Sequence, residues 1–406
     1  MYKITVAGKT MVGNNEDSWR RDPRIWFEQS SAGKAGVAYV GYAGKSGPDG
    51  AVNEYGLAYD AFTMPHKPGM PGRDPGKKDF SYSQLKTIMQ TCKTVDDVNA
   101  ILSEQNLHVL NGSPLFNGGM LLFADSTGKY LVVEAGKLTF GNDEKFLLAN
   151  FSIADTKDLS TIKMERYCKG VDFLRNKPLS TDVAFCTALS DTMSVNRKKA
   201  GDGTLYTTIY DLKDGIIYAY FFHDYNQRVT FNLKEELAKG DHAYSFTDLF
   251  PSNYNFSRFL SFMTPQNNKL IFMFLIACSL IFAFTFVFFL FSFFKSPKSE
   301  PRRYLKLILS FTGLAFCYYS YVLLRNQGIY YFPAPFLDGY SVMVSISSYL
   351  PLLLILSIIP LVLALIRIIR KKQWSRFARI IFVVNTFVFI ILLGLFAYWQ
   401  LFDIFG

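Results

Sequence analysis

The sequence predicts a two-part chain, an α+β domain followed by an all-α domain of four transmembrane helices. Residues 1–268 contain stretches with strand-like alternation and stretches with helical periodicity, and no long apolar run. Residues 269–406 contain four long apolar runs, and the composition changes near Pro265. These observations place the α+β domain at residues 1–250, a linker at 251–268 and the transmembrane domain at 269–406.

The first half of the α+β domain begins with a predicted hairpin. Residues 3–6 and 10–12 form its strands, and Gly8 supplies the backbone freedom that a tight turn needs. Further strands are expected at residues 36–42 and 56–62. Helices are expected at residues 81–92 and after Thr94, where Thr94 and Asp97 form a capping-box pattern with Asp in place of Glu.

The second half of this domain returns from helices to strands. Residues 118–140 predict two strands, residues 162–175 predict a helix, and residues 210–221 predict a hairpin with a turn at Asp214-Gly215. Strands, then helices, then strands again are typical of a layered α+β domain in which helices cover sheets.

The four apolar runs are long enough to cross a membrane. They cover residues 270–294, 307–324, 341–366 and 380–401. A helix needs about 20 mainly apolar residues to cross a hydrocarbon core of about 30 Å. Four such runs in succession leave no polar face for water, so they are better explained as membrane helices than as buried helices of a soluble protein.

Charge divides the chain in the same way as hydropathy. Residues 1–268 contain 30 Lys or Arg and 30 Asp or Glu, so the net charge of +10 lies entirely in residues 269–406. Because binding of a phosphate backbone needs a local cationic excess, this distribution argues against nucleic acid as a partner of the first domain.

The basic residues of the membrane domain predict its orientation. They gather in the first and third loops, which the positive-inside rule assigns to the cytoplasm, and comprise Lys295, Lys298, Arg302, Arg303, Lys306, Arg367, Arg370, Lys371, Lys372, Arg376 and Arg379. We therefore expect a multi-pass protein of a bacterial cytoplasmic membrane. Its N-terminal domain is expected on the periplasmic or extracellular side.

An N-terminal domain outside the cytoplasm requires an export signal. Residues 1–6 contain no apolar signal region. Either the charge rule misleads here, or residues that precede Met1 are missing from the sequence. We favour the second explanation, because the motifs described next also point upstream of Met1.

Two short motifs stand in the first quarter of the chain: residues 13–17 read Gly-Asn-Asn-Glu-Asp, and residues 52–57 read Val-Asn-Glu-Tyr-Gly-Leu. They resemble the Gly-Arg-Asn-x-Asp and Met-Asn-Glu-x-Gly-Leu elements of N-terminal-nucleophile amide hydrolases, the family that includes choloylglycine hydrolase, penicillin V acylase and isopenicillin-N acyltransferase-like proteins. Three further elements, at residues 130–134, 148–151 and 160–167, and the late hairpin follow in the expected order. The resemblance implies an αββα sandwich.

The family's chemistry depends on a Cys that becomes the first residue of the processed chain. Its α-amine, with a pKa near 8, takes the proton from its own thiol, which a peptide nitrogen cannot do. The thiolate then attacks an amide carbonyl, and an oxyanion, an acyl-enzyme and hydrolysis follow. The family's spacing places this Cys about two or three residues upstream of Met1, where a truncated start removes it together with a signal peptide.

The resemblance also assigns roles to residues of this chain. Asp17 matches the acid that holds the nucleophile's amine, Asn150 matches the amide of the oxyanion hole, and Arg166 matches an Arg near the nucleophile. Thr63 falls at a second oxyanion-hole or substrate-contacting position. Asn14 departs from the family, because its position usually holds an Arg beside the Cys; this departure affects thiol activation and substrate polarity.

Each of these residues also has a plainer interpretation. Asp17 is otherwise a turn carboxylate, Asn150 a loop residue or a chance glycosylation match, and Arg166 a residue of an ordinary amphipathic helix. The cysteines present, Cys92, Cys168 and Cys186, lie on predicted helices or in an apolar stretch, where unreactive thiols are usual. Thr5 as an alternative nucleophile requires removal of four residues and a broken strand.

No cofactor or metal is expected. The four His residues have no ligand spacing with one another or with Cys, and no Gly-rich phosphate loop precedes a helix. The sequence therefore predicts a membrane-tethered amidase that hydrolyses a small amphiphilic N-acyl amide, with the lipid bilayer as partner and no nucleic acid. Its oligomeric state is not indicated.

Two other classes of function remain open. The first domain is alternatively a catalytically inactive, ligand-binding part of a membrane sensor or transport-associated protein, as the absent Cys and Asn14 allow. The helices are alternatively a transporter or signalling module. Against the latter, they carry almost no intramembrane charge, which solute pathways usually need.

Overall fold

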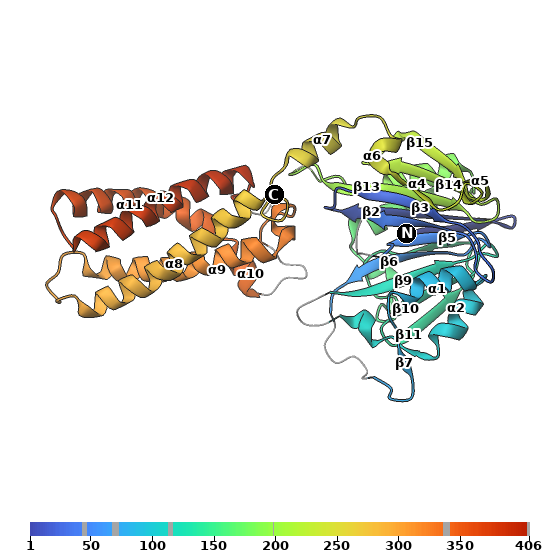
Figure 1. Ribbon diagram of the computed structural model, residues 1–406, viewed down its shortest axis with the longest axis horizontal. Helices are drawn as coiled ribbons and strands as arrows, with labels where there is room; N and C mark the ends of the chain where they lie inside the picture. Colours follow the sequence, from blue (N-terminus) through green and yellow to red (C-terminus); the bar gives the residue numbers. More distant parts are fainter. Residues whose placement is uncertain (43–46, 67–72, 113–116, 198, 336–341, 404–406) are drawn as a thin grey trace. The chain divides into compact units, whose positions relative to one another are not determined.

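The computed structural model divides the chain into two compact units, Met1–Phe259 and Leu260–Gly406. It describes all residues except 43–46, 67–72, 113–116, 198, 336–341 and 404–406. The first unit contains the strands and several helices, and the second contains the long C-terminal helices (Figure 1).

The first unit contains a six-stranded sheet built from strands that lie far apart in the sequence. Its order is β12-β1-β2-β13-β14-β15, and all of its strand pairs are antiparallel. The strands are β1 (Tyr2–Val6), β2 (Lys9–Ser18), β12 (Lys145–Leu147), β13 (Gly203–Asp211), β14 (Ile216–Phe221) and β15 (Asp224–Asn232). The N-terminal hairpin thus lies in the middle of this sheet.

A second, eight-stranded sheet has the order β11-β10-β9-β6-β5-β4-β3-β16. Its strands are β3 (Pro23–Glu28), β4 (Val37–Tyr42), β5 (Gly50–Asn53), β6 (Ala58–Met64), β9 (Gly118–Ala124), β10 (Tyr130–Glu134), β11 (Lys137–Gly141) and β16 (His242–Ser245). A separate short parallel pair joins β7 (Lys78–Asp79) to β8 (Gln105–Asn106).

Helices cover the outer faces of both sheets. Buried residues of α1 (Gln84–Thr91) and α2 (Val95–Leu102) share one core with the eight-stranded sheet. Those of α3 (Glu165–Asn176) and α4 (Val183–Thr192) share another with the six-stranded sheet. The sheets face each other, since Tyr42 of β4 contacts Tyr206 of β13 with ring centroids 6.4 Å apart. The expected α+β class with an αββα arrangement is confirmed.

Several predicted elements are present and others were missed. The N-terminal hairpin turns at Ala7 and Gly8, both with positive φ, and the Thr94–Asp97 capping box is complete. Residues 118–141 form three strands rather than two. Strands β3, β5, β12, β15 and β16 and helix α4 were not predicted. Strand β5 is short, and the apolar residues of α4 do not separate clearly onto one face.

Short helices complete the first unit and lead to the second. They are η1 (His108–Asn111), η2 (Leu159–Thr161), α5 (Leu233–Leu237), α6 (Phe246–Leu249) and α7 (Tyr254–Ser261). The last of these lies within residues 251–268, which the sequence indicates as a linker. Phe256 and Phe259 are the buried residues of α7.

The second unit contains four helices that are long and apolar enough to cross a membrane. Its helices are α8 (Lys269–Lys295), α9 (Arg303–Arg325), η3 (Gln327–Tyr330), α10 (Val342–Ser347), α11 (Leu350–Arg370) and α12 (Arg376–Tyr398). Helices α10 and α11 together form the third candidate span, Val342–Arg370. The four predicted apolar runs fall on these spans with two exceptions. Ser341 lies outside the described residues, and the fourth run was predicted to reach Leu401, whereas α12 ends at Tyr398.

Candidate active site

A continuous chain of hydrogen bonds joins three of the predicted site residues. One guanidinium nitrogen of Arg166, in the first turn of α3, donates to Asp17 Oδ2 at the end of β2. The other donates to the side-chain oxygen of Asn150, which follows β12. Arg166 therefore fixes the acid and the amide with respect to each other.

Asn150 and Asp17, the two ends of this series of hydrogen bonds, each make a further hydrogen bond. Asn150 Nδ2 donates to the backbone carbonyl of Thr63 on β6 over 2.8 Å, and Thr204 Oγ1 on β13 donates to Asp17 Oδ1 over 2.7 Å. Thr63 thus takes part through its backbone, while its side chain is exposed. Residues from both sheets and from α3 meet here, which explains why motifs far apart in the sequence converge.

Asn14 lies on the opposite face of β2. It is 4% exposed, and its Nδ2 donates to Asp60 Oδ1 on β6 over 2.9 Å, so the pair bridges the two sheets. Among the described residues, Asn14 makes no hydrogen bond to the Arg166 chain. Gly50 leaves room for the Asp60 carboxylate, because a Cβ at position 50 would lie 3.0 Å from Asp60 Oδ1.

Sequence reasoning missed the acidic residues that surround this bridge. Burial raises the pKa of Asp60 and of Glu16 well above their usual range, and the carboxylates of Asp49 and Asp60 add to the effect at Glu16. Burial also raises the pKa of Asp49 to about 6, against the opposing charge of Arg20. Asp60 was detectable as an acid within the apolar strand at residues 58–62; Asp49 gave no local signal.

The backbone of Met1 enters the structure beside these groups. Its nitrogen donates to the carbonyl of Leu148 over 3.0 Å, which extends the pairing of β1 with β12. Burial lowers the pKa of the Met1 α-amine to about 6, while the charges of Asp60 and Asp17 oppose the shift and that of Arg166 adds to it. The thioether of Met1 has no ionisable proton, so Met1 cannot form a thiolate that attacks an amide carbonyl.

The cysteines lie in other environments. Burial raises the pKa of the Cys186 thiol to about 12, and it also raises the pKa of Cys92; both residues belong to hydrophobic cores. Cys168 donates its thiol proton to the carbonyl of Ile162 over 3.1 Å. Across the described part of the chain, no three His, Cys, Asp or Glu side chains are arranged to hold a metal ion.

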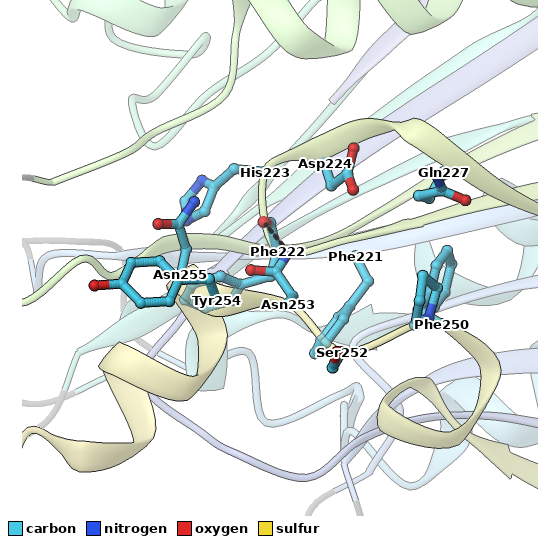
Figure 2. A pocket seen from close by; sticks show the side chains of 11 residues that line it. Phe221, Phe222, His223, Asp224, Gln227, Phe250, Ser252, Asn253, Tyr254 and Asn255 are labelled. Carbon is cyan, nitrogen blue, oxygen red and sulfur yellow. Dashed lines mark hydrogen bonds between the residues drawn. The ribbon is translucent and has the colours of Figure 1, made fainter.

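A cavity of about 330 Å³ lies at the turn between β14 and β15. Figure 2 shows Phe221 and Phe222 near its centre, Phe250 and Gln227 at one side, and Asn255 and Tyr254 at the other. None of the five predicted site residues lines it.

His223 lies in the cavity wall and close enough to Asp17 to be affected by its charge. It has a φ of +62°. Burial lowers its pKa to about 4, and the nearby Asp17 carboxylate opposes this shift. A Cβ at Gly203 would lie 2.9 Å from its Cε1 atom, so glycine permits the ring to approach β13 next to Thr204.

Comparisons with known proteins find similarity at the level of structure. No protein-family model and no curated protein sequence matches the chain. A variant of the conjugated bile acid hydrolase from Clostridium perfringens is 16% identical, with a TM-score of 0.46, over 62% of this chain and 97% of that one.

Two further solved structures match over about half of the chain. Penicillin V acylase from Agrobacterium tumefaciens is 15% identical, with a TM-score of 0.40, over 54% of this chain and 81% of that one. A Caenorhabditis elegans N-acylethanolamine-hydrolyzing acid amidase ortholog is 10% identical, with a TM-score of 0.34, over 52% and 92% of the two chains.

Proposed function

We propose that the first unit is an amidase of the N-terminal-nucleophile type that hydrolyses a linear, non-peptide N-acyl amide, using a Cys just upstream of Met1. The observation that carries the proposal is the position of Arg166, whose guanidinium holds Asp17 and Asn150 together beside the backbone of Met1. These are the residues to which the sequence resemblance assigns catalytic roles.

The hydrogen bonds of Asn150 leave it one free donor. Its side-chain oxygen accepts from Arg166, and one hydrogen of Nδ2 points to the carbonyl of Thr63. An amide nitrogen has two hydrogens, so the second is available to an oxyanion that forms on the substrate carbonyl. Because the other bonds fix the side chain, the donor needs no reorientation during the reaction.

Asp17 has its two oxygens oriented by Arg166 and Thr204. Each carboxylate oxygen has a second lone pair, so Asp17 can still accept from the ammonium group that forms when an α-amine takes the thiol proton. This negative charge supports the amine as a base, as the proposed mechanism requires.

The second unit supports a membrane location. Four candidate spans and the two basic loops favour a multi-pass protein whose first unit lies on the periplasmic or extracellular side. A tether at the membrane raises the local concentration of amphiphilic compounds, which favours substrates with a fatty or steroidal acyl group. Hydrolysis and acyl transfer share the same acyl-enzyme.

The proposal is tested with the protein extended by its upstream genomic sequence. An in-frame signal peptide that ends at a Cys about two or three codons before Met1 is expected, and a stop codon there would refute a Cys-dependent amidase. The extended protein is then assayed for release of free amine from N-acyl amides. Replacement of that Cys by Ala should abolish release, and equal rates from both forms would exclude the nucleophile.

A second candidate function is binding without catalysis. It is favoured by the cavity at the β14–β15 turn, which involves none of the predicted catalytic residues. If ligand binding is the function, N-acyl compounds should bind the extended protein and remain intact after prolonged incubation. Release of the amine would decide in favour of the amidase.

A further inference from the structure

One end of the membrane bundle concentrates positive charge. Residues 269–406 contain 13 Lys or Arg, and 11 of them fall in the loop between α8 and α9, the loop between α11 and α12, or the helix turns beside these loops. We call this set the basic end; it comprises the residues named above from Lys295 to Lys306 and from Arg367 to Arg379. The other two cations, Lys269 and Arg325, lie at the opposite ends of α8 and α9.

The two loops form a single surface. Arg302 Nη1 donates to Gln373 Oε1 over 2.5 Å, and the indole nitrogen of Trp374 donates to the carbonyl of Pro301 over 3.2 Å. Lys306 Nζ lies 5.3 Å from the centre of the Trp374 ring. Figure 1 shows both loops at the same end of the bundle. The charges of the two loops therefore act together.

Negative charge within the basic end is already neutralised. Glu300 is the one acidic residue between Lys295 and Arg379 that the structure describes, and it pairs with Lys306 over 2.7 Å. Seven exposed cations have no ion pair with any described residue: Lys295, Lys298, Arg367, Arg370, Lys371, Lys372 and Arg376. This surplus calls for an anionic partner.

The surface next to the basic end is apolar and aromatic. Phe294 and Tyr304 are each 70% exposed, and Phe377 is 55% exposed. Tyr side chains such as Tyr304 gather at the boundary between hydrocarbon and headgroups, and exposed Phe side chains suit the adjoining hydrocarbon. If the helices cross a membrane, the free cations therefore lie at the level of the lipid phosphates.

We propose that the basic end binds the headgroups of anionic phospholipids. The phosphate supplies the missing negative charge, and the acyl chains continue along the exposed apolar faces of α8, α9 and α12. A soluble anion provides only the first of these interactions. The proposal rests on membrane insertion of the four helices and does not depend on the amidase activity of the first unit.

The test uses the full chain purified in a zwitterionic detergent. Binding of dioleoylphosphatidylglycerol and of dioleoylphosphatidylcholine is measured by native mass spectrometry, with inorganic phosphate as a third ligand. Phosphatidylglycerol is expected to bind at least about ten-fold more tightly than phosphatidylcholine, since each nearby cation contributes about five-fold. Inorganic phosphate should neither bind stably nor displace phosphatidylglycerol, and added salt should weaken the preference.

Matched variants locate the site. The combination Arg370→Gln, Lys371→Gln, Lys372→Gln and Arg376→Gln should remove the preference for phosphatidylglycerol. The pair Lys269→Gln and Arg325→Gln, at the other end of the helices, should leave affinity within about two-fold. If the quadruple variant does not fold, the double variant Lys295→Gln with Lys298→Gln replaces it. Its affinity for phosphatidylglycerol is expected to fall by at least about five-fold.

Three results would overturn the proposal. They are equal affinity for the two lipids, an equal loss in the variants of both ends, and tight binding of inorganic phosphate that displaces the lipid. None of them bears on amine release by the first unit, so failure here is distinguishable from failure of the amidase proposal.

Discussion

The two faces of strand β2 place polar residues in opposite electrostatic environments. On one face, the side chain of Asp17 is 17% exposed and meets the guanidinium of Arg166. On the other face, Asn14 and Glu16 point toward the second sheet, where Asp60 and Asp49 lie. Successive residues of one strand thus contribute to an ion pair and to an acidic, largely buried cluster.

The two faces therefore favour different protonation states of their carboxyl groups. A guanidinium beside a carboxylate offsets the loss of hydration that burial of the carboxylate would otherwise cost. Burial raises the pKa of Glu16 and Asp60, and the neighbouring carboxylates add to this shift, so the protonated form of these carboxyls is favoured. The Asp17 face therefore suits the chemistry that we propose, while the inter-sheet face makes stability depend on pH.

The largest expected effect comes from breaking the ion-pair face. Arg166→Met should lower kcat of the extended protein by about 10²- to 10³-fold, because Asn150 loses its orientation and Asp17 loses its counter-charge. Steady-state amine release measures this change. Lys169→Met, on the same helix and paired with Glu165 at the surface, is the control and should stay within about two-fold. An Arg166→Met protein with unchanged kcat would refute a catalytic role of the hydrogen bonds that join Arg166 to Asp17 and Asn150.

The next effect comes from adding charge to the acidic face. Asn14→Asp should destabilise the full chain by about 3 kcal/mol at pH 7, because it places a carboxyl against Asp60 without a cation. Thermal unfolding should then occur roughly 6–12 °C lower. At pH 4 the shift should shrink, since the added carboxyl is largely protonated. A shift of the same size at both pH values would contradict this electrostatic explanation.

A third effect follows from the proton held by Asp49. Its folded pKa of about 6 lies above the value of 3.8 that is usual for Asp, so the folded state holds the proton between these values. The contribution of Asp49 to the free energy of unfolding is therefore fully present below about pH 4. It falls as the pH rises toward 6, by about 2 kcal/mol for this partly exposed site. Asp49→Asn should flatten that decline in thermal unfolding, whereas Asp248→Asn at the surface should not.

The smallest effect concerns the anchor of Asp17. Thr204→Val keeps the shape of the side chain but removes its hydrogen bond to Asp17 Oδ1 and the bond it accepts from the nitrogen of Val195. A loss of about 1–1.4 kcal/mol of transition-state stabilisation corresponds to a decrease in kcat of roughly five- to ten-fold. If Thr204→Val equals Arg166→Met in effect, the threonine matters for folding rather than for orientation.

The sequence predicts local structure well where chemistry is local. Gly8, the Thr94–Asp97 capping box and the Asp214-Gly215 turn each determine their element from a few neighbouring residues. Strand β5 was not predicted because all its residues are buried, so it has no alternation of polar and apolar positions. Helix α4 was not predicted because it is only weakly amphipathic. Their identity depends on the sheets against which they pack.

The candidate site shows the same limit. Asp17, Asn150 and Arg166 are recognisable because they stand in motifs with a known order, and the structure brings them together. The partner of Asn14 is not recognisable from the sequence, because Asp60 is 46 residues away. The two residues meet only because the two sheets pack face to face. Thr204, 187 residues from Asp17, likewise has no local signal.

The most direct test of the central claim is the mass of the protein during turnover. The extended protein is mixed with an excess of an N-acyl amide, quenched in acid within the first turnover and digested. The account predicts that the acyl group is attached to the peptide that begins with the upstream Cys and continues into Met1, and that Cys→Ala abolishes the adduct. Amine release without this adduct, or with an acyl group on another residue, would contradict the account.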